Sequence, residues 1–397
     1  MRIKFWGTRG SIPICEADSI RYGGNTTCVE VRTSDGELIV LDAGTGIRKL
    51  GLSLLEDPTF KHKGSIFITH THWDHIQGFP FFTPAFMAKN HFVFYGQFKL
   101  YGRLEDSLKG QMEHIYFPVR LRDMGSRLEF VEIIEEEVQI GSARVVSRHL
   151  NHPQGVLGYR IEDGDNVFVF CTDTEHYLDR IDPKVVELAK GADVLVYDSQ
   201  YTEEEYPQKI GWGHSTWRAG VDIARAADAK QLVLTHHDPQ HNDAFIDGIL
   251  ARARKELPDT LAAYQDMTMT LEPKAKRGGQ KRVKASGKKK TSELELRTSQ
   301  GHLVVRAPSQ AAAMASPGFS ERVLAKLDKG LKGIVIDMGD VKEIDSPALG
   351  SLALIIKRVQ KLRVPLVVAR PSAFVREVLS ITGFPEVLKI VEDHPAL

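Results

Sequence analysis

Seven consecutive residues combine three imidazoles with a carboxylate and form the strongest chemical signal in the sequence. The segment reads Thr69-His70-Thr71-His72-Trp73-Asp74-His75. In an extended segment His70 and His72 project to the same side, and Asp74 and His75 follow just after the expected turn. Borderline transition metals take imidazole nitrogen and carboxylate oxygen, so this segment alone could supply two ligands to each of two ions. The alternative to a metal site is a strand end whose polar side chains are satisfied by ordinary hydrogen bonds. Four potential metal ligands at this spacing disfavour that alternative.

Strands are expected to position these side chains, and three further potential metal ligands follow predicted strands elsewhere in the chain. The apolar run 65–68 leads directly into the motif and is typical of a buried strand, while Trp-Asp-His is typical of a loop entering a helix. His152, Asp173 and His236 each lie in a turn after an apolar run. Two ions with a bridging ligand need more donors than the motif offers, so we expect these three to complete the site.

Composition bounds the class of protein. With 397 residues the chain should hold two or three domains, and its apolar (42%) and charged (26%) contents are ordinary for a globular protein. No stretch approaches the roughly 20 apolar residues of a membrane span, and the N-terminus has no signal-peptide core. Three widely spaced cysteines predict no disulfide framework, which suits the cytoplasm.

The net charge of zero hides an uneven distribution. Between Lys274 and Lys290 there are nine Lys or Arg and no acidic residue, so the remainder of the chain sums to about −9. A nucleic-acid enzyme would carry its positive charge on the folded part, so a large nucleic acid is disfavoured as a partner. The segment has almost no apolar side chains, and we interpret 272–292 as a basic, flexible linker between domains 1–271 and 293–397.

The pattern of the first domain is β-rich at its start and alternates α and β later. Residues 2–60 alternate apolar runs with Gly-rich turns, and a second β-rich half spans 127–172. Helices are expected at 219–229 and 243–257. The aromatic-rich segment 79–98 could stack on a base, but core packing is the favoured use for most of its rings.

Residues 1 to about 270 resemble proteins of the metallo-β-lactamase fold, specifically those of its phosphodiesterase and ribonuclease Z-like branch. The resemblance rests on His-Thr-His-Trp-Asp-His, on His152 with Gly158-Tyr159-Arg160, and on three later segments: Thr172-Asp173-Thr174, Gly213-His214-Ser215-Thr216 and Thr235-His236. It implies an α/β fold, a four-layer αβ/βα sandwich.

The resemblance also implies the roles of the donors. His70, His72 and His152 would bind one divalent ion; Asp74, His75 and His236 would bind the other; Asp173 would bridge them with a water or hydroxide. Zinc is the expected metal, and manganese or iron would fit the same ligands. Two ions generate a hydroxide nucleophile near neutral pH, and Asp74 would also orient that water or accept its proton.

Two more residues match an acid–base pair of this branch. His214 would protonate the leaving oxygen as general acid, and Asp198 would orient it. The alternative for His214 is a histidine at a helix start. With this pair, the resemblance implies a dinuclear metal-dependent phosphodiesterase.

The substrate is expected to be a small phosphodiester, with a 3′,5′-cyclic nucleotide favoured. Arg9, Asn25, Thr26 or an aromatic from 79–98 would hold the part beyond the phosphate, although the glycine-rich turn at 22–27 could equally be structural. A ribonuclease Z-like RNA-processing nuclease is an alternative. Its long basic arm has no room here, because His152 and Asp173 are 21 positions apart and most of that interval reads as a hairpin.

Residues 293–397 resemble a STAS domain of the anti-sigma-factor antagonist type, a second and smaller α/β domain. The matching stretches are Ile334–Met338, Ile344–Gly350 and Leu379–Phe384. The family's phosphorylatable serine falls on Ser346, which is also typical of a helix N-cap followed by Pro347. We interpret this domain as a regulatory, docking or dimerising module, so a protein partner and a homodimer are both candidates. A nucleotide-sensing regulatory protein that signals through this domain is the alternative to an enzyme.

Overall fold

The structure, a computed structural model of the whole chain, describes residues 1–99, 103–272, 295–310, 313–314, 317–327, 331–362 and 364–397. It divides into two compact units, one of residues 1–97 and 104–275 and the other of 98–103 and 276–397. The predicted linker, 272–292, lies outside the described residues except for Glu272. No helix in the described part is long and apolar enough to cross a membrane.

The first unit contains two seven-stranded sheets. The first sheet has the order β14-β1-β2-β3-β4-β5-β6, and the second β13-β12-β11-β10-β9-β8-β7. The strands of the first sheet are β1 (Arg2–Gly7), β2 (Cys28–Arg32), β3 (Leu38–Leu41), β4 (Lys63–Phe67), β5 (His91–Gln97), β6 (Arg127–Ile133) and β14 (Thr268–Thr270). Those of the second are β7 (Glu137–Ile140), β8 (Ala143–Leu150), β9 (Val156–Asp163), β10 (Asn166–Cys171), β11 (Val194–Asp198), β12 (Leu232–Thr235) and β13 (Leu261–Ala262).

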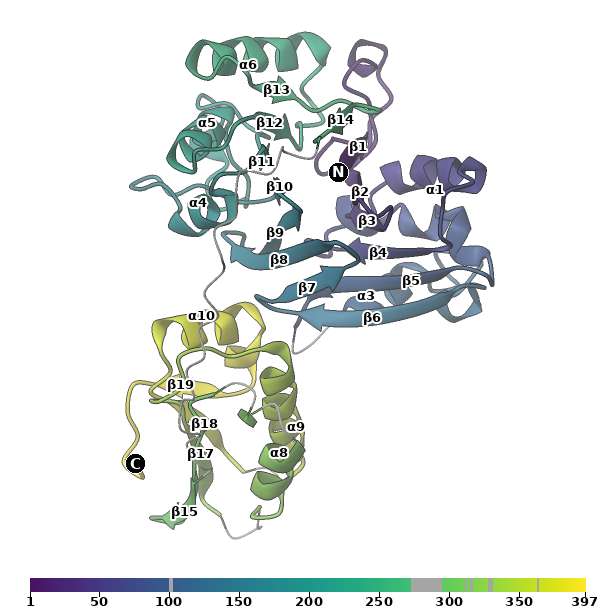
Figure 1. Cartoon of the computed structure of the whole chain (residues 1–397). Coiled ribbons are helices and arrows are strands. Elements are labelled where there is room, and N and C mark those ends of the chain that lie inside the picture. Colours follow the sequence, from purple (N-terminus) through teal and green to yellow (C-terminus); the bar gives the residue numbers. More distant parts are fainter. Residues whose placement is uncertain (100–102, 273–294, 311–312, 315–316, 328–330, 363) are drawn as a thin grey trace. The chain divides into compact units, whose positions relative to one another are not determined.

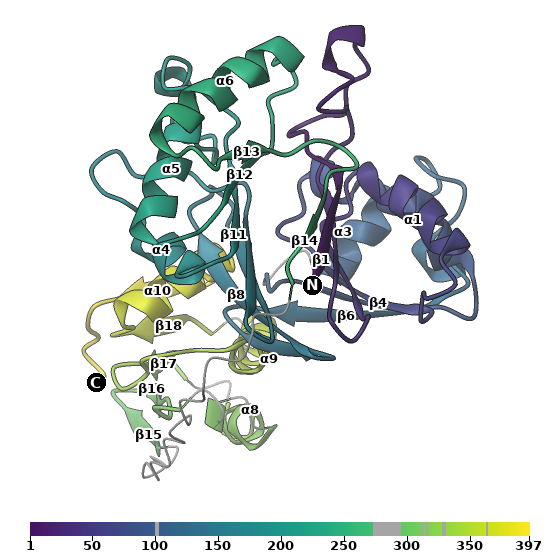
Figure 2. The same ribbon diagram turned by 45° about the horizontal axis from the view of Figure 1, so that its top comes forward.

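Helices cover the outer face of each sheet, which confirms the predicted four-layer α/β sandwich (Figures 1 and 2). The α-helices of this unit are α1 (Gly46–Glu56), α2 (Trp73–Ile76), α3 (Leu104–Gln111), α4 (Pro183–Ala189), α5 (Trp217–Ala226) and α6 (Asp243–Glu256). Its short 3₁₀ helices are η1 (Ala17–Ser19), η2 (Phe79–Phe81), η3 (Thr83–Phe86), η4 (Leu121–Asp123) and η5 (Tyr206–Gln208).

The inner faces of the two sheets share one apolar core. Ile3, Val31 and Phe67 of the first sheet pack in the same cluster as Phe168 and Val196 of the second. Every residue of β11 is buried, because the other sheet covers one face and helices cover the other. A strand buried on both faces reads as a continuous apolar run, which is why the sequence located it correctly.

Strand direction brings the polar turns to one edge. β3, β4, β5 and β6 run parallel, as do β10, β11 and β12, and β8 points the same way as β10 because both pair antiparallel with β9. The turns after β4, β8, β10, β11 and β12 therefore emerge at the carboxyl ends of their strands. These turns carry every predicted metal ligand.

Helix starts follow their capping residues. The hydroxyl of Thr216 accepts a hydrogen bond from the Ala219 N–H at 3.2 Å, so α5 begins at Trp217, two residues before the predicted start. His214 lies outside this helix, so the alternative of a helix-start histidine does not hold for it.

The second unit is a five-stranded sheet of order β15-β16-β17-β18-β19 with helices. Its elements are β15 (Glu295–Ser299), β16 (His302–Arg306), α8 (Pro317–Leu324), β17 (Gly333–Asp337), α9 (Ser346–Leu362), β18 (Leu366–Ala369), α10 (Ala373–Ile381), η6 (Phe384–Glu386) and β19 (Lys389–Val391).

One prediction about this unit is wrong: Ser346 is not the N-cap of α9. The Asp345 carboxylate accepts a hydrogen bond from the Ala348 N–H at 2.9 Å, and the Asp345 carbonyl accepts from the Leu349 N–H. Asp345 is therefore the cap and Ser346 is the first helical residue. The side chain of Ser346, on which phosphorylation was predicted, lies outside the described part of the structure.

Candidate active site

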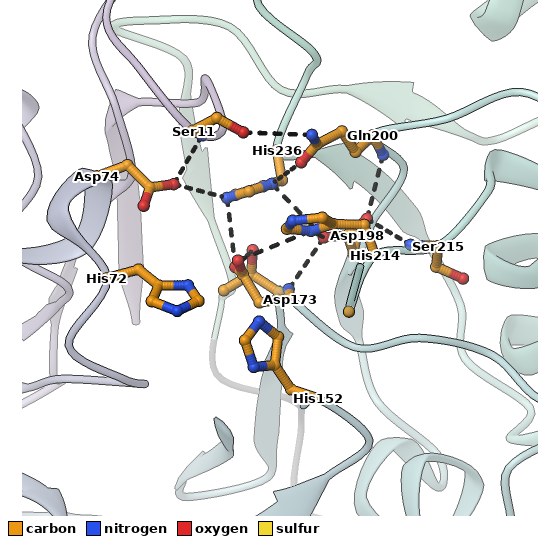
Figure 3. A network of polar contacts seen from close by, with 12 residues as sticks. Ser11, His72, Asp74, His152, Asp173, Asp198, Gln200, His214, Ser215 and His236 are labelled. Carbon is orange, nitrogen blue, oxygen red and sulfur yellow. Dashed lines mark hydrogen bonds and ion pairs between the residues drawn. The ribbon is translucent and has the colours of Figure 1, made fainter. Parts of the chain in front are cut away.

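All seven predicted metal ligands meet at the edge formed by the strand ends. Figure 3 labels His72, Asp74, His152, Asp173 and His236 among them. His70, His72 and His152 form one group, and Asp74, His75, Asp173 and His236 form another; within each group the potential ligand atoms lie within 4.8 Å of one another. The segment after β4 supplies four of these side chains, and the turns after β8, β10 and β12 supply one each.

Asp173 faces both groups. Its Oδ1 lies 3.7 Å from Nε2 of His70, and its Oδ2 lies 3.2 Å from Nε2 of His75 and 3.3 Å from Nε2 of His236. The residue is buried and has a φ of 53°, in the left-handed region, which a short polar side chain tolerates better than most. One carboxylate with an oxygen toward each group has the arrangement that a bridging ligand requires.

The chemistry of the donor set fits two cations. Nε2 of His70 and of His152 is buried and has no hydrogen-bond partner within the described part of the chain. Asp42, Asp74, Asp173 and Asp198 add four carboxylates that are each no more than 5% exposed. Buried carboxylates and orphaned imidazole nitrogens are costly unless a cation joins them.

Burial and the nearby carboxylates shift the pKa values of these histidines in opposite directions. Burial lowers the pKa of His152 to about 4 and lowers that of His70 well below its usual value. Burial also opposes protonation of His236, but the nearby Asp173 and Asp74 carboxylates outweigh it and raise its pKa to about 9. Around His236 the protein thus favours a positive charge between its carboxylates.

Asp198 and His214 form a pair beside these two groups. Nδ1 of His214 lies 3.1 Å from Oδ2 of Asp198. Because a carboxylate only accepts, Nδ1 carries the hydrogen and Nε2 is left for another partner. The Asp198 carboxylate is fixed by the backbone N–H groups of Asp173, Gln200 and Ser215, at 3.0, 3.1 and 2.9 Å. Asp198, His214, Asp173 and His236 also lie close enough to form a third group of potential ligands, but the hydrogen bonds already made by Asp198 favour positioning over ligation.

A pocket of about 460 Å³ opens onto the site. Ser11, Thr71, His72, Trp73, Asp74, Asp173 and His214 line it. The Ser11 N–H donates to Oδ2 of Asp74 at 2.7 Å, and Nε2 of Gln200 donates to the Ser11 hydroxyl at 3.3 Å (Figure 3). The carboxylate of Asp74 is thereby held from the side of the pocket.

Two of the three predicted substrate contacts, Arg9 and Thr26, are fully buried and bind the protein's own groups. The Arg9 side chain is fully buried, and its guanidinium donates to the carbonyls of Gly23, Asp238 and His241. Thr26 is also fully buried, and its hydroxyl accepts from the Thr45 N–H at 2.9 Å. The Asn25 amide donates to Gln265 at 2.9 Å. Burial thus leaves the Arg9 and Thr26 side chains no exposed surface for a ligand, and a contact of the half-buried Asn25 with substrate stays a prediction.

Several aromatic residues of the segment 79–98 pack in the core, which is the use that the sequence favoured for most of them. Phe79, Phe82, Phe92 and Phe94 are fully buried in the core on the outer face of the first sheet. These four rings therefore serve core packing, whereas Phe81 and Phe86 of the same segment are exposed.

Three residues that support the site were not predicted from the sequence. The buried Asp42 accepts from Nδ1 of His75 at 2.8 Å and from the Thr69 N–H at 2.8 Å. The Gln200 amide oxygen lies 2.8 Å from Nδ1 of His236. Each such partner fixes which ring nitrogen of its histidine faces inward. In the sequence, only their position could have indicated these residues. Asp42 follows the apolar run Leu38–Leu41, and Gln200 follows shortly after the apolar run that precedes Asp198.

Glu175 is the third, and it organises the loop that carries His214. Its carboxylate accepts hydrogen bonds from the Tyr206 hydroxyl at 2.9 Å, the Gly211 N–H at 2.7 Å and the Gly213 N–H at 2.9 Å. Gly213 has a φ of 87°, and a Cβ there would clash with the ring of His152. The loop therefore needs both the carboxylate and the glycine to bring His214 against Asp198.

Comparisons with known proteins agree with this fold. Residues 38–237, half of the chain, match the family model described as the β-lactamase superfamily domain, and residues 293–396 match the STAS domain model. The chain therefore belongs to the β-lactamase superfamily, as a metal-dependent hydrolase of the metallo-β-lactamase fold with a C-terminal STAS domain. Both predicted family memberships are confirmed.

Individual relatives are distant. Ribonuclease Z of Prochlorococcus marinus is 23% identical over 68% of this chain and all of its own length, and ribonuclease Z of Bacillus subtilis is 26% identical over 52% of this chain and 80% of its own length. The metallo-β-lactamase fold protein YhfI from Bacillus subtilis superposes with a TM-score of 0.51 at 16% identity, over 68% of this chain and 98% of its own. Human tRNase Z, short form, superposes with a TM-score of 0.50 at 20% identity, over 68% of this chain and all of its own. At these identities the structural likeness establishes the fold.

Proposed function

We propose that this chain is a phosphodiesterase that uses two divalent ions and acts on a small phosphodiester, with a 3′,5′-cyclic nucleotide as the favoured substrate. The observation that carries the proposal is the Asp198–His214 pair placed beside the two groups of ligands. A hydrolase whose leaving group is a stable anion needs no proton donor, whereas an alkoxide leaving a phosphate does. The pair therefore favours cleavage of an alkyl phosphoester.

Two ions would be held by the seven grouped side chains, with Asp173 shared between them. When bound, such ions lower the pKa of water and stabilise negative charge on phosphate oxygens. Zinc is the favoured metal, since imidazole and carboxylate ligands suit it, and manganese or iron fits the same donors.

The protein's own residues then supply orientation and a proton. His214 lines the pocket with its Nδ1 held by Asp198, so its other nitrogen is the one that would donate to the leaving oxygen. Asp198 would keep the imidazole correctly aimed and stabilise its charged form. Asp74, held by the Ser11 N–H, would orient the attacking water or accept its proton.

The size of the pocket supports a small substrate. Its volume of about 460 Å³ is within the usual range of small-ligand sites. Every lining residue except Trp73 has a polar side chain, which suits a phosphate group and a sugar.

A ribonuclease Z-like nuclease is the second candidate, because several relatives carry that name and align over all or nearly all of their length. Two observations weigh against it. The alignment with the Prochlorococcus relative runs over 326 positions but covers only 68% of this chain, about 270 residues, so about 55 of its positions have no counterpart here. Between His152 and Asp173 there is only the hairpin of β9 and β10, which leaves no arm for a large RNA.

A direct assay separates these candidates. Metal-loaded protein should hydrolyse 3′,5′-cyclic nucleotides and bis(p-nitrophenyl) phosphate and should leave a precursor transfer RNA intact. Cleavage of the RNA, without hydrolysis of the small esters, would favour the ribonuclease Z-like nuclease instead. Retention of an unaltered nucleotide, with no product from any substrate, would favour a sensor that signals through the STAS domain.

His214→Ala provides the matched test of mechanism. Its turnover of a cyclic nucleotide should fall by about 10²–10⁴-fold, while bis(p-nitrophenyl) phosphate, whose leaving group needs no proton, should lose far less. The metal content should stay at two ions per chain. Loss of metal instead would make His214 a ligand and contradict its role as general acid.

A further inference from the structure

Trp73 is the one tryptophan whose ring has no partner within the described part of the chain. Trp6 is buried, donates to Glu30 and lies under Lys4, whose Nζ is 3.7 Å from the ring centroid. Lys209 lies 4.2 Å from the ring of Trp212, and Arg252 lies 5.1 Å from that of the buried Trp217. Trp73 is 77% exposed and makes none of these contacts.

This exposed ring is also the large aromatic side chain of the active-site pocket. Trp73 lines the pocket together with His72 and Asp74, its two neighbours in sequence, and with Asp173 and His214. All other lining residues are polar. An indole left in water forgoes the stabilisation that burying its large apolar surface would bring, so its position on a site wall is informative.

The backbone that carries this ring is fixed, although no hydrogen bond or ring contact within the described part of the chain fixes the ring itself. Trp73 is the first residue of α2, whose other three residues are buried. The Gln77 N–H donates to the Trp73 carbonyl at 2.7 Å, and the Ala43 N–H donates to the His75 carbonyl at 2.7 Å. The short helix that carries Asp74 and His75 therefore also fixes the backbone position from which the indole extends at the pocket wall.

We infer that Trp73 is the specificity-determining residue of the site and stacks on a planar heterocyclic base attached to the scissile phosphodiester. The inference rests on the proposed phosphodiesterase function and adds the residue that would bind the base of a nucleotide substrate. The phosphate would lie among the carboxylates and imidazoles, and the base would cover the indole. Every base has a flat face, so this contact selects nucleotides over simple phosphodiesters without selecting one base.

Two esters with the same leaving group test this selection. The p-nitrophenyl ester of thymidine 5′-phosphate carries a base, and p-nitrophenyl methyl phosphate does not. Trp73→Ala should raise KM for the thymidine ester by about tenfold, the usual effect of losing one base–aromatic stack, with kcat nearly unchanged. The KM for the methyl ester should change less than about twofold, since no stack is lost there.

Companion variants separate stacking from general effects. Trp73→Phe should keep most of the preference for the thymidine ester and Trp73→Leu should lose it, because both are apolar but only phenylalanine stacks. Trp212→Phe, at the other exposed tryptophan, should leave the preference unchanged. Equal changes in KM for both esters in Trp73→Ala, or no change, would overturn the inference while the phosphodiesterase function stood.

Fluorescence gives a readout that does not depend on turnover. In Trp212→Phe, Trp73 is the remaining exposed indole, since Trp6 and Trp217 are 2% and 5% exposed. Adenosine 5′-monophosphate should quench this emission, and the additional change Trp73→Phe should abolish the quenching. Quenching without hydrolysis of either ester would uphold stacking and reject the proposed enzymatic function; hydrolysis of both esters without quenching would do the reverse.

Discussion

Single buried residues outside the two ligand groups hold the predicted metal ligands in position. Asp42 is the clearest, because it is fully buried and holds Nδ1 of His75 at 2.8 Å. It also accepts from both the N–H and the hydroxyl of Thr69, the residue that precedes the first histidine. One carboxylate therefore orients a predicted ligand and the segment that carries the others.

Asp42→Asn should weaken metal binding by about 10–100-fold while the protein stays folded. The amide of asparagine is similar in size to the carboxylate of Asp42. It lacks the negative charge that makes the imidazole of His75 a stronger ligand for a metal ion. The measurement is a competition titration of zinc against a chromophoric chelator. Asp163→Asn is the matched control: Asp163 is buried and accepts from Ser34 and Ser142, and it should keep the wild-type affinity. Equal affinity in both variants would show that His75 needs no carboxylate partner.

At the scale of elements, the loop between η5 and α5 brings the acid into the site. It is tied to the turn after β10 through Glu175, whose two oxygens accept from Gly211, Gly213 and Tyr206. A second tie is the Glu175 N–H, which donates to the Asn151 carbonyl beside His152. The turns after β8 and β10 and this loop therefore form one hydrogen-bonded set.

Glu175→Gln should lower turnover of a cyclic nucleotide by about 10–100-fold, because its NH₂ group would face an N–H donor and displace the loop. Bis(p-nitrophenyl) phosphate should be much less affected, since its leaving group needs no proton from His214. Glu30→Gln, at a buried glutamate that accepts from Trp6, is the control and should alter neither rate. A similar loss with both substrates would indicate a general structural role for Glu175.

The sequence predicted elements and ligands well where one local pattern determines them. Strands buried on both faces read as apolar runs, and donors that follow such runs reach the same sheet edge, so His152, Asp173 and His236 could be placed with the motif. Arg9 and Thr26 could not be placed, because the carbonyls and hydroxyls they bind are set by tertiary packing. Asp42 and Glu175 were not predicted for the same reason, since a residue that supports the site through hydrogen bonds has no characteristic spacing in the sequence.

At the scale of the whole molecule, each unit has its own apolar core. Three large clusters fill the first unit, and a separate one forms around Val304, Val335 and Ala369 in the second. The predicted ligands all belong to the first unit. We therefore expect the two units to unfold separately and to respond to different perturbations.

A pH-dependent ion pair offers a perturbation specific to the second unit. Burial alone would raise the pKa of Asp337, but hydrogen bonds from Arg370 and the Gly339 N–H outweigh it and lower that pKa. A carboxyl whose folded-state pKa is lowered stabilises the fold above its unfolded value and loses that contribution as pH falls through the folded one. Asp337→Asn should therefore destabilise this unit by about 1–2 kcal/mol at pH 7 and by progressively less below about pH 4.

Metal binding offers the complementary perturbation, specific to the first unit. Zinc bound only by the folded state should stabilise that unit by about 2.7 kcal/mol at a hundred times its dissociation constant, which raises the melting temperature by about 5–10 °C. Calorimetry of the full chain should then show two transitions, of which zinc raises only one and Asp337→Asn lowers only the other. If both perturbations moved a single transition, the units would fold cooperatively, and the signal of metal or substrate binding would have a direct route from the hydrolase unit to the STAS domain.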